Sequence, residues 1–114
     1  MYNGNVIRNK TRNSLIASNA RKVKGLEKII GLIGKNAPEA ILFETHFGIH
    51  TFFLKLPIDV LILDKNNQIV ALKKILKPNR FFLWNCRYNL VIELPEESIE
   101  KSNTQIGDLI EFNL

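Results

Sequence analysis

The chain has 114 residues, of which 46% are hydrophobic and 24% charged, as in an ordinary globular domain. A chain of this length can bury an adequate core without disulfides, and its single cysteine, Cys86, excludes an internal one. No apolar run approaches the ~20 residues needed to cross a bilayer, and residues 1–14 lack the apolar centre of a secretory signal. We therefore expect one cytoplasmic domain over residues 1–114, with no membrane partner.

The net charge of +5 is concentrated in the N-terminal third of the chain. Residues 1–40 carry eight lysines and arginines against two acidic residues, whereas residues 41–114 carry eight against nine. Such a basic segment could bind phosphate groups. The alternative, that these cations are solvated and keep the protein soluble, is favoured because basicity alone identifies no partner.

The first half of the chain predicts short strands and one helix. Short apolar runs indicate strands at residues 6–7, 14–17 and 21–23. Apolar residues at positions 26, 29, 30 and 33 then follow the i, i+3, i+4, i+7 spacing of a helix that Gly34 and Pro38 end. Two more strands are predicted, at residues 40–43 and 49–54.

The strongest pattern is the apolar run Val-Leu-Ile-Leu at residues 60–63. Because strand side chains alternate, this run predicts a strand over residues 58–64 that is covered on both faces. The polar segment that follows tolerates left-handed backbone, so residues 68–75 should return antiparallel as the second arm of a hairpin.

The C-terminal part predicts strands at residues 81–84, 89–94 and 109–112, with a short helix between the last two that begins near Pro95 and ends near Asn103. The whole pattern predicts an α+β fold. We expect mostly antiparallel β-sheet, which could curl into a partial barrel, with two short helices.

Several short motifs occur along this pattern in a fixed order. They are Gly31-Leu32-Ile33-Gly34, Gly48-Ile49-His50-Thr51-Phe52-Phe53-Leu54, Pro57-Ile58-Asp59, Leu94-Pro95 and Gly107-Asp108. In order and spacing the chain resembles the domain-of-unknown-function family 192 over residues 6–112. The resemblance implies a compact, β-rich prokaryotic protein and adds no reaction. Many members carry Trp-Met-Lys-Asn-Thr where this chain has residues 50–54, so a ligand that needs that Lys-Asn pair is not implied.

Residues that usually carry catalysis are sparse. His46 and His50 are four apart but span a Phe-Gly turn, and no carboxylate-cysteine set completes a metal site. Cys86 lies beside Arg87 and could be an activated thiol, although packing among aromatic strands is favoured. Serine-hydrolase, phosphate-loop and dinucleotide motifs are missing from the sequence. We predict no catalytic residue, metal or cofactor, and consider an enzyme the less favoured class.

The candidate ligand-binding residues are His50, Thr51, Lys55, Asp59, Arg80 and Trp84. His50 and Thr51 point to opposite faces of one strand, and Asp59 opens the central strand. His50 and Lys55 could donate to a small polar or anionic ligand that Asp59 orients in a shallow pocket. The favoured alternative is that Asp59 caps loop backbone or pairs with Lys55, and that His50 is half-buried and satisfied.

Basic and aromatic residues interleave between positions 73 and 88. They are Lys73, Lys74, Lys77, Arg80, Phe81, Phe82, Trp84, Arg87 and Tyr88. Exposed aromatic faces flanked by cations hold single-stranded nucleic acids. However, residues 82 and 84 share one strand face and residues 81 and 83 the other, so at least half must face a core. Aromatic packing with solvated lysines is therefore favoured.

Three functions stay open. The preferred one is a small non-catalytic binding or accessory domain with a shallow pocket for a polar or anionic ligand. The second is nucleic-acid binding through the basic N-terminal third and segment 73–88. The third is an enzyme of unknown type that uses His50 and Asp59. Whether the candidate residues line one concavity should discriminate these functions.

Overall fold

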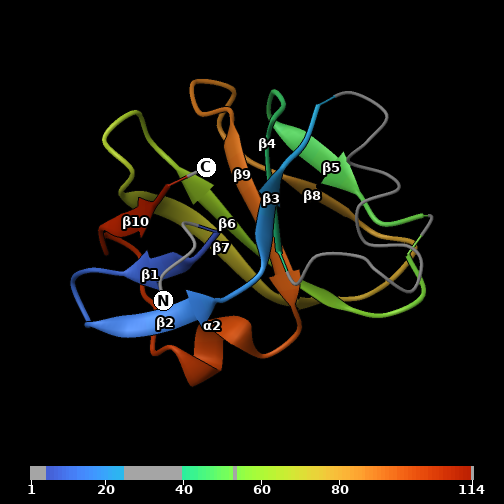
Figure 1. Ribbon diagram of the computed structural model, residues 1–114. Coiled ribbons are helices and arrows are strands. Elements are labelled where there is room, and N and C mark those ends of the chain that lie inside the picture. Colours follow the sequence, from blue (N-terminus) through green and yellow to red (C-terminus); the bar gives the residue numbers. More distant parts are fainter. Residues whose placement is uncertain (1–4, 25–39, 53, 114) are drawn as a thin grey trace.

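A computed structural model describes residues 5–24, 40–52 and 54–113 (Figure 1). Within these ranges the protein is mostly β, with antiparallel-rich sheets and one short helix, α2 (Ser98–Lys101). The strands are β1 (Ile7–Asn9), β2 (Ser14–Ala17), β3 (Ala20–Lys22), β4 (Ala40–Glu44), β5 (Gly48–His50), β6 (Ile58–Leu63), β7 (Ile69–Leu76), β8 (Phe81–Leu83), β9 (Leu90–Pro95) and β10 (Ile110–Phe112). The predicted helix over residues 26–33 lies outside the described residues.

The described strands form three sheets. A five-stranded sheet has the order β3-β4-β9-β6-β7, a three-stranded sheet has the order β10-β1-β2, and β5 pairs with β8. Each pair of strands is antiparallel except β3 with β4, which are parallel. The mostly antiparallel sheet structure is confirmed, whereas curling into a partial barrel stays a prediction.

Strand β6 lies at the centre of the molecule. All six of its residues are buried, because it has a neighbour on each edge and cover on each face. Leu61 and Leu63 belong to one hydrophobic cluster, and Val60 and Ile62 belong to another. This is the two-sided burial that the apolar run predicts, and it divides the core into two layers.

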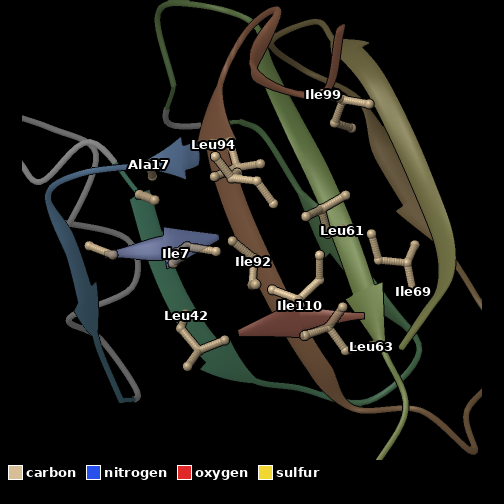
Figure 2. Close-up of a cluster of buried hydrophobic side chains, with 13 residues drawn as sticks. Ile7, Ala17, Leu42, Leu61, Leu63, Ile69, Ile92, Leu94, Ile99 and Ile110 are labelled. Atoms are coloured by element: carbon tan, nitrogen blue, oxygen red, sulfur yellow. The ribbon is translucent and has the colours of Figure 1, made fainter. Parts of the chain in front are cut away.

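The first core layer lies between the five-stranded sheet and the three-stranded sheet. Ile7 of β1, Ala17 of β2 and Ile110 of β10 pack toward the larger sheet, and Ile99 of α2 packs at its end (Figure 2). The residues that they meet on the larger sheet include Leu42, Leu61, Leu63, Ile69, Ile92 and Leu94. We call this the closed side of the central sheet.

The second core layer lies on the opposite face of the five-stranded sheet, under the small β5-β8 sheet. The larger sheet contributes Ile41, Phe43, Ile58, Val60, Ile62, Leu76 and Val91. Partly buried side chains that pack onto them include Ile49 of β5, Phe82 of β8 and the adjacent Trp84. Among the described residues, the inner face of the small sheet packs against the central sheet.

The predicted hairpin between β6 and β7 is confirmed. The two strands pair antiparallel, and Asn67 in the turn has a φ of 64°. The Oδ1 atom of Asp64 accepts hydrogen bonds from the N–H groups of Asn66 (2.8 Å) and Gln68 (3.0 Å). Asparagine tolerates this left-handed backbone, and the Asp64 side chain satisfies the turn amides that the strands leave unpaired.

The predicted strand over residues 49–54 is wrong beyond His50. The Thr51 carbonyl accepts hydrogen bonds from the N–H groups of Leu54 (3.2 Å) and Asn79 (3.1 Å). The first of these bonds closes a turn, so the chain leaves the sheet directly after β5.

Among the described residues, no helix is long and apolar enough to span a membrane.

Candidate functional site

Thr51 is a structural anchor for the small sheet. Its side chain is buried, and its Oγ1 donates to the Lys77 carbonyl (2.6 Å) while it accepts from the Arg80 N–H (3.0 Å). The Thr51 N–H also donates to the Arg80 carbonyl (2.9 Å). Because these bonds occupy the hydroxyl and tie the start of β8 to the end of β5, Thr51 positions the sheet and has no free group for a ligand.

Asp59 is a second structural anchor. Its side chain is fully buried in β6, its Oδ1 accepts from the Ile75 N–H (2.8 Å), and its Oδ2 accepts from the Ile99 N–H (2.9 Å). One carboxylate therefore joins β6 to the end of β7 and to the start of α2. Of the two interpretations, this geometry favours the one in which Asp59 serves backbone amides.

The backbone around Asp59 explains why an acid is needed there. The β6-β7 register shifts between Ile58 and Val60, which pair with Leu76 and Lys73, so two residues of β7 bulge opposite Asp59. One of them, Ile75, has a φ of 53°, a rare conformation for a β-branched residue. The bulge turns the Ile75 amide away from the ladder, and the Asp59 carboxylate accepts its hydrogen bond.

His50 and Asp59 are not brought together. Asp59 alternates along β6 with Ile58 and Val60, which pack into the layer under the β5-β8 sheet, so Asp59 faces the closed side. His50 lies on the small sheet and is exposed. Lys55 is also exposed, in the loop between β5 and β6. The candidate residues therefore do not line one concavity.

The outer face of the β5-β8 sheet carries an exposed cluster that we call the outer patch, formed by His50, Phe52, Phe81 and Leu83. His50 is directly opposite Phe81 across the two strands. The His50 ring stacks on Phe52 with 4.8 Å between centroids, and Phe52 meets Phe81 at 5.1 Å with 78° between their planes. The exposed fractions are 46% for Phe52 and 65% each for Phe81 and Leu83.

Gly48 completes the outer patch. It is opposite Leu83, and a Cβ atom built on Gly48 would lie only 2.7 Å from Leu83 Cδ2. The Leu83 side chain therefore lies over the bare glycine backbone. The patch extends across both strands, and His50 is its one polar member.

The inner face of the same sheet is packed. Phe82 and Trp84 are half-buried against the second core layer, and the Trp84 Nε1 donates to the Tyr88 carbonyl (2.7 Å). The prediction that at least half of these aromatic residues face a core is confirmed for this pair. The prediction that packing explains the segment is wrong for Phe81, which contacts rings of the outer patch and is largely exposed.

The chain around the outer patch is positively charged. Residues 45–58 and 65–92 contain no aspartate or glutamate, and the second range carries six lysines and arginines. Arg80 immediately precedes Phe81, and its Nη1 donates to the carbonyls of Asn79 (3.3 Å) and Pro78 (3.5 Å). These contacts hold a guanidinium at the turn beside the patch, and Lys77 in the same turn is exposed.

A polar network on the closed side contains Asn9, Arg12, Thr104 and Asp108. The Asp108 carboxylate accepts from Asn9 Nδ2 (2.8 Å), Arg12 Nε (3.1 Å) and the Gln105 N–H (2.9 Å). Burial raises the pKa of Asp108, but these hydrogen bonds and the Arg12 charge outweigh it and hold the pKa below its usual value. Arg12 is one of the cations of the basic N-terminal third, and it is used inside the fold.

Other chemistry is sparse in the part of the chain that the structure describes. Cys86 is exposed in the turn after β8, so the prediction that it packs in a core is wrong. No three His, Cys, Asp or Glu side chains of the described ranges lie close enough to hold a metal ion. An open groove of about 400 Å³ is formed by none of the candidate residues. Its lining is Leu15, Ile16, Pro95, Glu96, Ser98 and Lys101.

The favoured interpretation that His50 is half-buried is wrong, because His50 is exposed. The sequence pattern included Phe81 in the nucleic-acid alternative, but it did not single out Phe52 or Leu83. The signal that could have found them is charge. The acid-free ranges 45–58 and 65–92 contain both strands of the small sheet and their turns. Apolar and aromatic residues flanked by cations and no acids are the composition expected of a surface that binds anions.

The fold and the outer patch together define a class of protein: a small, mostly β chain in which a five-stranded sheet has a different cover on each face. Residues 10–112 match the family described as uncharacterized ACR, DUF192. The chain belongs to this family, as its motifs indicate.

Relatives in this family come from archaea. The UPF0127 protein PF1050 of Pyrococcus furiosus is 29% identical over 94 residues, which cover 77% of this chain and 80% of that protein. The UPF0127 protein PH1112 of Pyrococcus horikoshii is 32% identical over 93 residues, covering 76% and 80%. A solved protein of unknown function from Novosphingobium aromaticivorans has a TM-score of 0.74 at 13% identity, covering 94% and 83%. At that identity the likeness shows the fold alone.

Proposed function

We propose that this protein is a non-catalytic binding domain, and that it holds an anionic ligand on the outer face of the β5-β8 sheet. The observation that carries the proposal is the outer patch, in which the exposed rings of His50, Phe52 and Phe81 lie side by side on and next to the β5-β8 pair. A contiguous exposed apolar surface of this kind marks a binding site, because it is removed from water when a ligand covers it. The ligand is anionic because the flanking sequence is basic and acid-free.

The buried polar residues support a non-catalytic role. The side-chain oxygen atoms of Thr51 and Asp59 form hydrogen bonds with backbone groups of the β7-β8 turn, β7 and α2. His50 lies on the side of the central sheet opposite to Asp59, so a histidine-carboxylate pair has no geometric support. Apart from His50, the residues that reach the outer patch offer ring faces and cations, and Asp59 is not positioned to orient His50 for proton transfer.

Thermal unfolding in the presence of inorganic polyphosphate tests this proposal. A ligand that binds only the folded state raises the midpoint, because it stabilises the protein by RT ln(1 + [L]/Kd). We expect polyphosphate to raise the midpoint of thermal unfolding. The rise should be smaller in Arg80→Ala and in Lys77→Ala than in the unchanged protein, and it should be unchanged in Lys10→Ala. Lys10 is the control because it is an exposed cation in the β1-β2 turn.

Two results would count against an anion site on the outer face. One is an unchanged midpoint at every polyphosphate concentration. The other is a rise that Lys10→Ala removes and that Arg80→Ala and Lys77→Ala leave intact, since this would move the site to the closed side of the sheet.

A further inference from the structure

We propose that the ligand of the outer patch is single-stranded nucleic acid, with bases stacked on the exposed rings and phosphates held by the adjacent cations. This inference rests on the proposed function and names its ligand class. It reverses the order of the sequence-based alternatives. The packing interpretation placed at least half of these aromatic residues in a core, and Phe81, on the other strand face, is 65% exposed.

The ring geometry favours unpaired bases. His50 and Phe52 form one stack with 25° between their planes, and Phe81 stands at 78° to both. The patch therefore presents two ring surfaces at a steep angle rather than one plane. Two bases can use both surfaces only if they are splayed apart, which a single strand allows and a duplex resists because its bases stay stacked inside.

The charges are placed for a phosphate backbone. Arg80 precedes Phe81 in the chain, so a base on the Phe81 ring would bring its phosphates near the guanidinium that Pro78 and Asn79 hold in the turn. Lys77 adds a cation in that turn, and Lys55 adds one in the loop after Phe52. Cations beside stacking rings are the combination that binds single strands with little sequence preference.

The same charges disfavour a second copy of this chain as the occupant. A twofold interface through the outer patch would place the cations of each β7-β8 turn against the corresponding basic surface of its partner. Like charges at close range oppose such a contact. A strand of phosphates neutralises the cations instead.

Fluorescence anisotropy with labelled ten-nucleotide oligothymidylate and oligoadenylate tests the inference, with a ten-unit inorganic polyphosphate and a ten-base-pair duplex as competitors. We expect the single strands to bind about tenfold or more tightly than the polyphosphate. Phe81→Ala should remove about that factor, since stacking of one base on a ring contributes on this scale. Phe81→Trp, which keeps a stacking surface, should bind as well as the unchanged protein.

The control variant is Ile106→Ala. Ile106 is 64% exposed, similar to Phe81, but lies in the segment between α2 and β10. We expect Ile106→Ala to bind the oligonucleotide unchanged. Binding should also weaken with salt, with a slope of about −0.7 in log K against log salt for each phosphate contacted. Circular dichroism of each variant shows whether it is folded.

The inference is overturned if polyphosphate and oligonucleotide bind equally and Phe81→Ala changes neither; the anion site of the proposed function would then survive alone. If neither anion binds at the patch, both proposals fail together. Tighter binding of the duplex overturns the single-strand assignment. Binding to vesicles of anionic phospholipid without binding to oligonucleotide, or a dimer that Phe81→Ala dissociates, would assign the patch to a different partner.

Discussion

The two faces of the central sheet are covered in different ways. On the closed side, three strands and α2 bury their apolar residues, and Asn9, Thr104 and Asp108 form a satisfied network beneath the surface. On the other side, the two strands β5 and β8 bury one face and expose the other. Packing accounts for most of the first cover, although Leu15 of β2 is 50% exposed and Ile106, between α2 and β10, is 64% exposed. The exposed rings of the second contribute nothing comparable to the core, which is why we assign them to binding.

Truncation of one buried side chain in β6 should give the largest loss of stability. The loss should be nearly the same for a side chain on either face of the strand. Leu61→Ala empties space in the closed-side layer, and Ile62→Ala empties space under the β5-β8 sheet. Each should lower the free energy of unfolding by about 2–5 kcal/mol, because both side chains are fully buried. Urea denaturation measures both. A much smaller loss of stability for Ile62→Ala would mean that the β5-β8 sheet does not keep water from the core layer beneath it.

Removal of the Asp59 carboxylate should be almost as damaging. Asp59→Ala leaves the amides of Ile75 and Ile99 without their acceptor in a buried place. Because the Ile75 bond is only partly buried, a cost of about 1–2 kcal/mol for each of the two unsatisfied groups gives a loss of about 2–4 kcal/mol on urea denaturation. The expected loss is structural, so oligonucleotide affinity measured well below the unfolding midpoint should be unchanged. Lost affinity in a protein that stays folded would return Asp59 to the binding site.

Adjacent phenylalanines on β8 should separate the two faces of the small sheet. Phe82→Ala should lower the free energy of unfolding by about 2 kcal/mol, roughly half the cost of truncating a fully buried phenylalanine, since the ring is half-buried. Phe81→Ala should change it by less than about 0.5 kcal/mol, as surface substitutions do. Thermal and urea melts of the two variants form a matched pair. Equal losses would show that Phe81 is packed in solution.

A pH-dependent loss of stability, smaller than the losses expected for Phe82→Ala and Asp59→Ala, is expected on the closed side. The folded state lowers the pKa of Asp108, so its contribution to stability is present above the unfolded pKa and is lost as pH falls through the folded pKa. Asp108→Asn should lower the free energy of unfolding by about 1–2 kcal/mol at pH 7. The difference in free energy of unfolding between Asp108→Asn and the unchanged protein should shrink below about pH 4, which is near the pKa of an aspartate in the unfolded chain. A constant difference from pH 7 to pH 2 would contradict the ion pair with Arg12.

Two apolar runs of the sequence show how far prediction could go. Residues 60–63 and 81–84 are each apolar at four successive positions. The first run lies in a strand covered on both faces, and the second covers the core with one face only. Alternation predicts which residues share a face, and it did so correctly for both. It cannot predict how many layers the fold stacks, so the exposure of Phe81 required the structure.

The candidate site was predictable only in part for a similar reason. A lone carboxylate in an apolar strand, such as Asp59, can serve a ligand or the backbone. The choice depends on the bulge at Ile75, and residues 68–76 carry no glycine or proline that would mark it. Thr51 is comparable, because its partners at positions 77 and 80 are distant in sequence. His50 and Arg80 stood out in the sequence because a polar or charged side chain in an apolar context is visible locally.

The most direct test of the different roles of the two sides is an NMR titration of the ¹⁵N-labelled protein with the ten-nucleotide oligothymidylate, in which the chemical shifts of the backbone amides are followed. The account predicts shifts for residues 48–52 and 80–83, which form the small sheet and its turns, and unchanged signals for β1, β2 and β10. Shifts concentrated in the three-stranded sheet, or no shift in the β5-β8 sheet at saturating oligonucleotide, would contradict it.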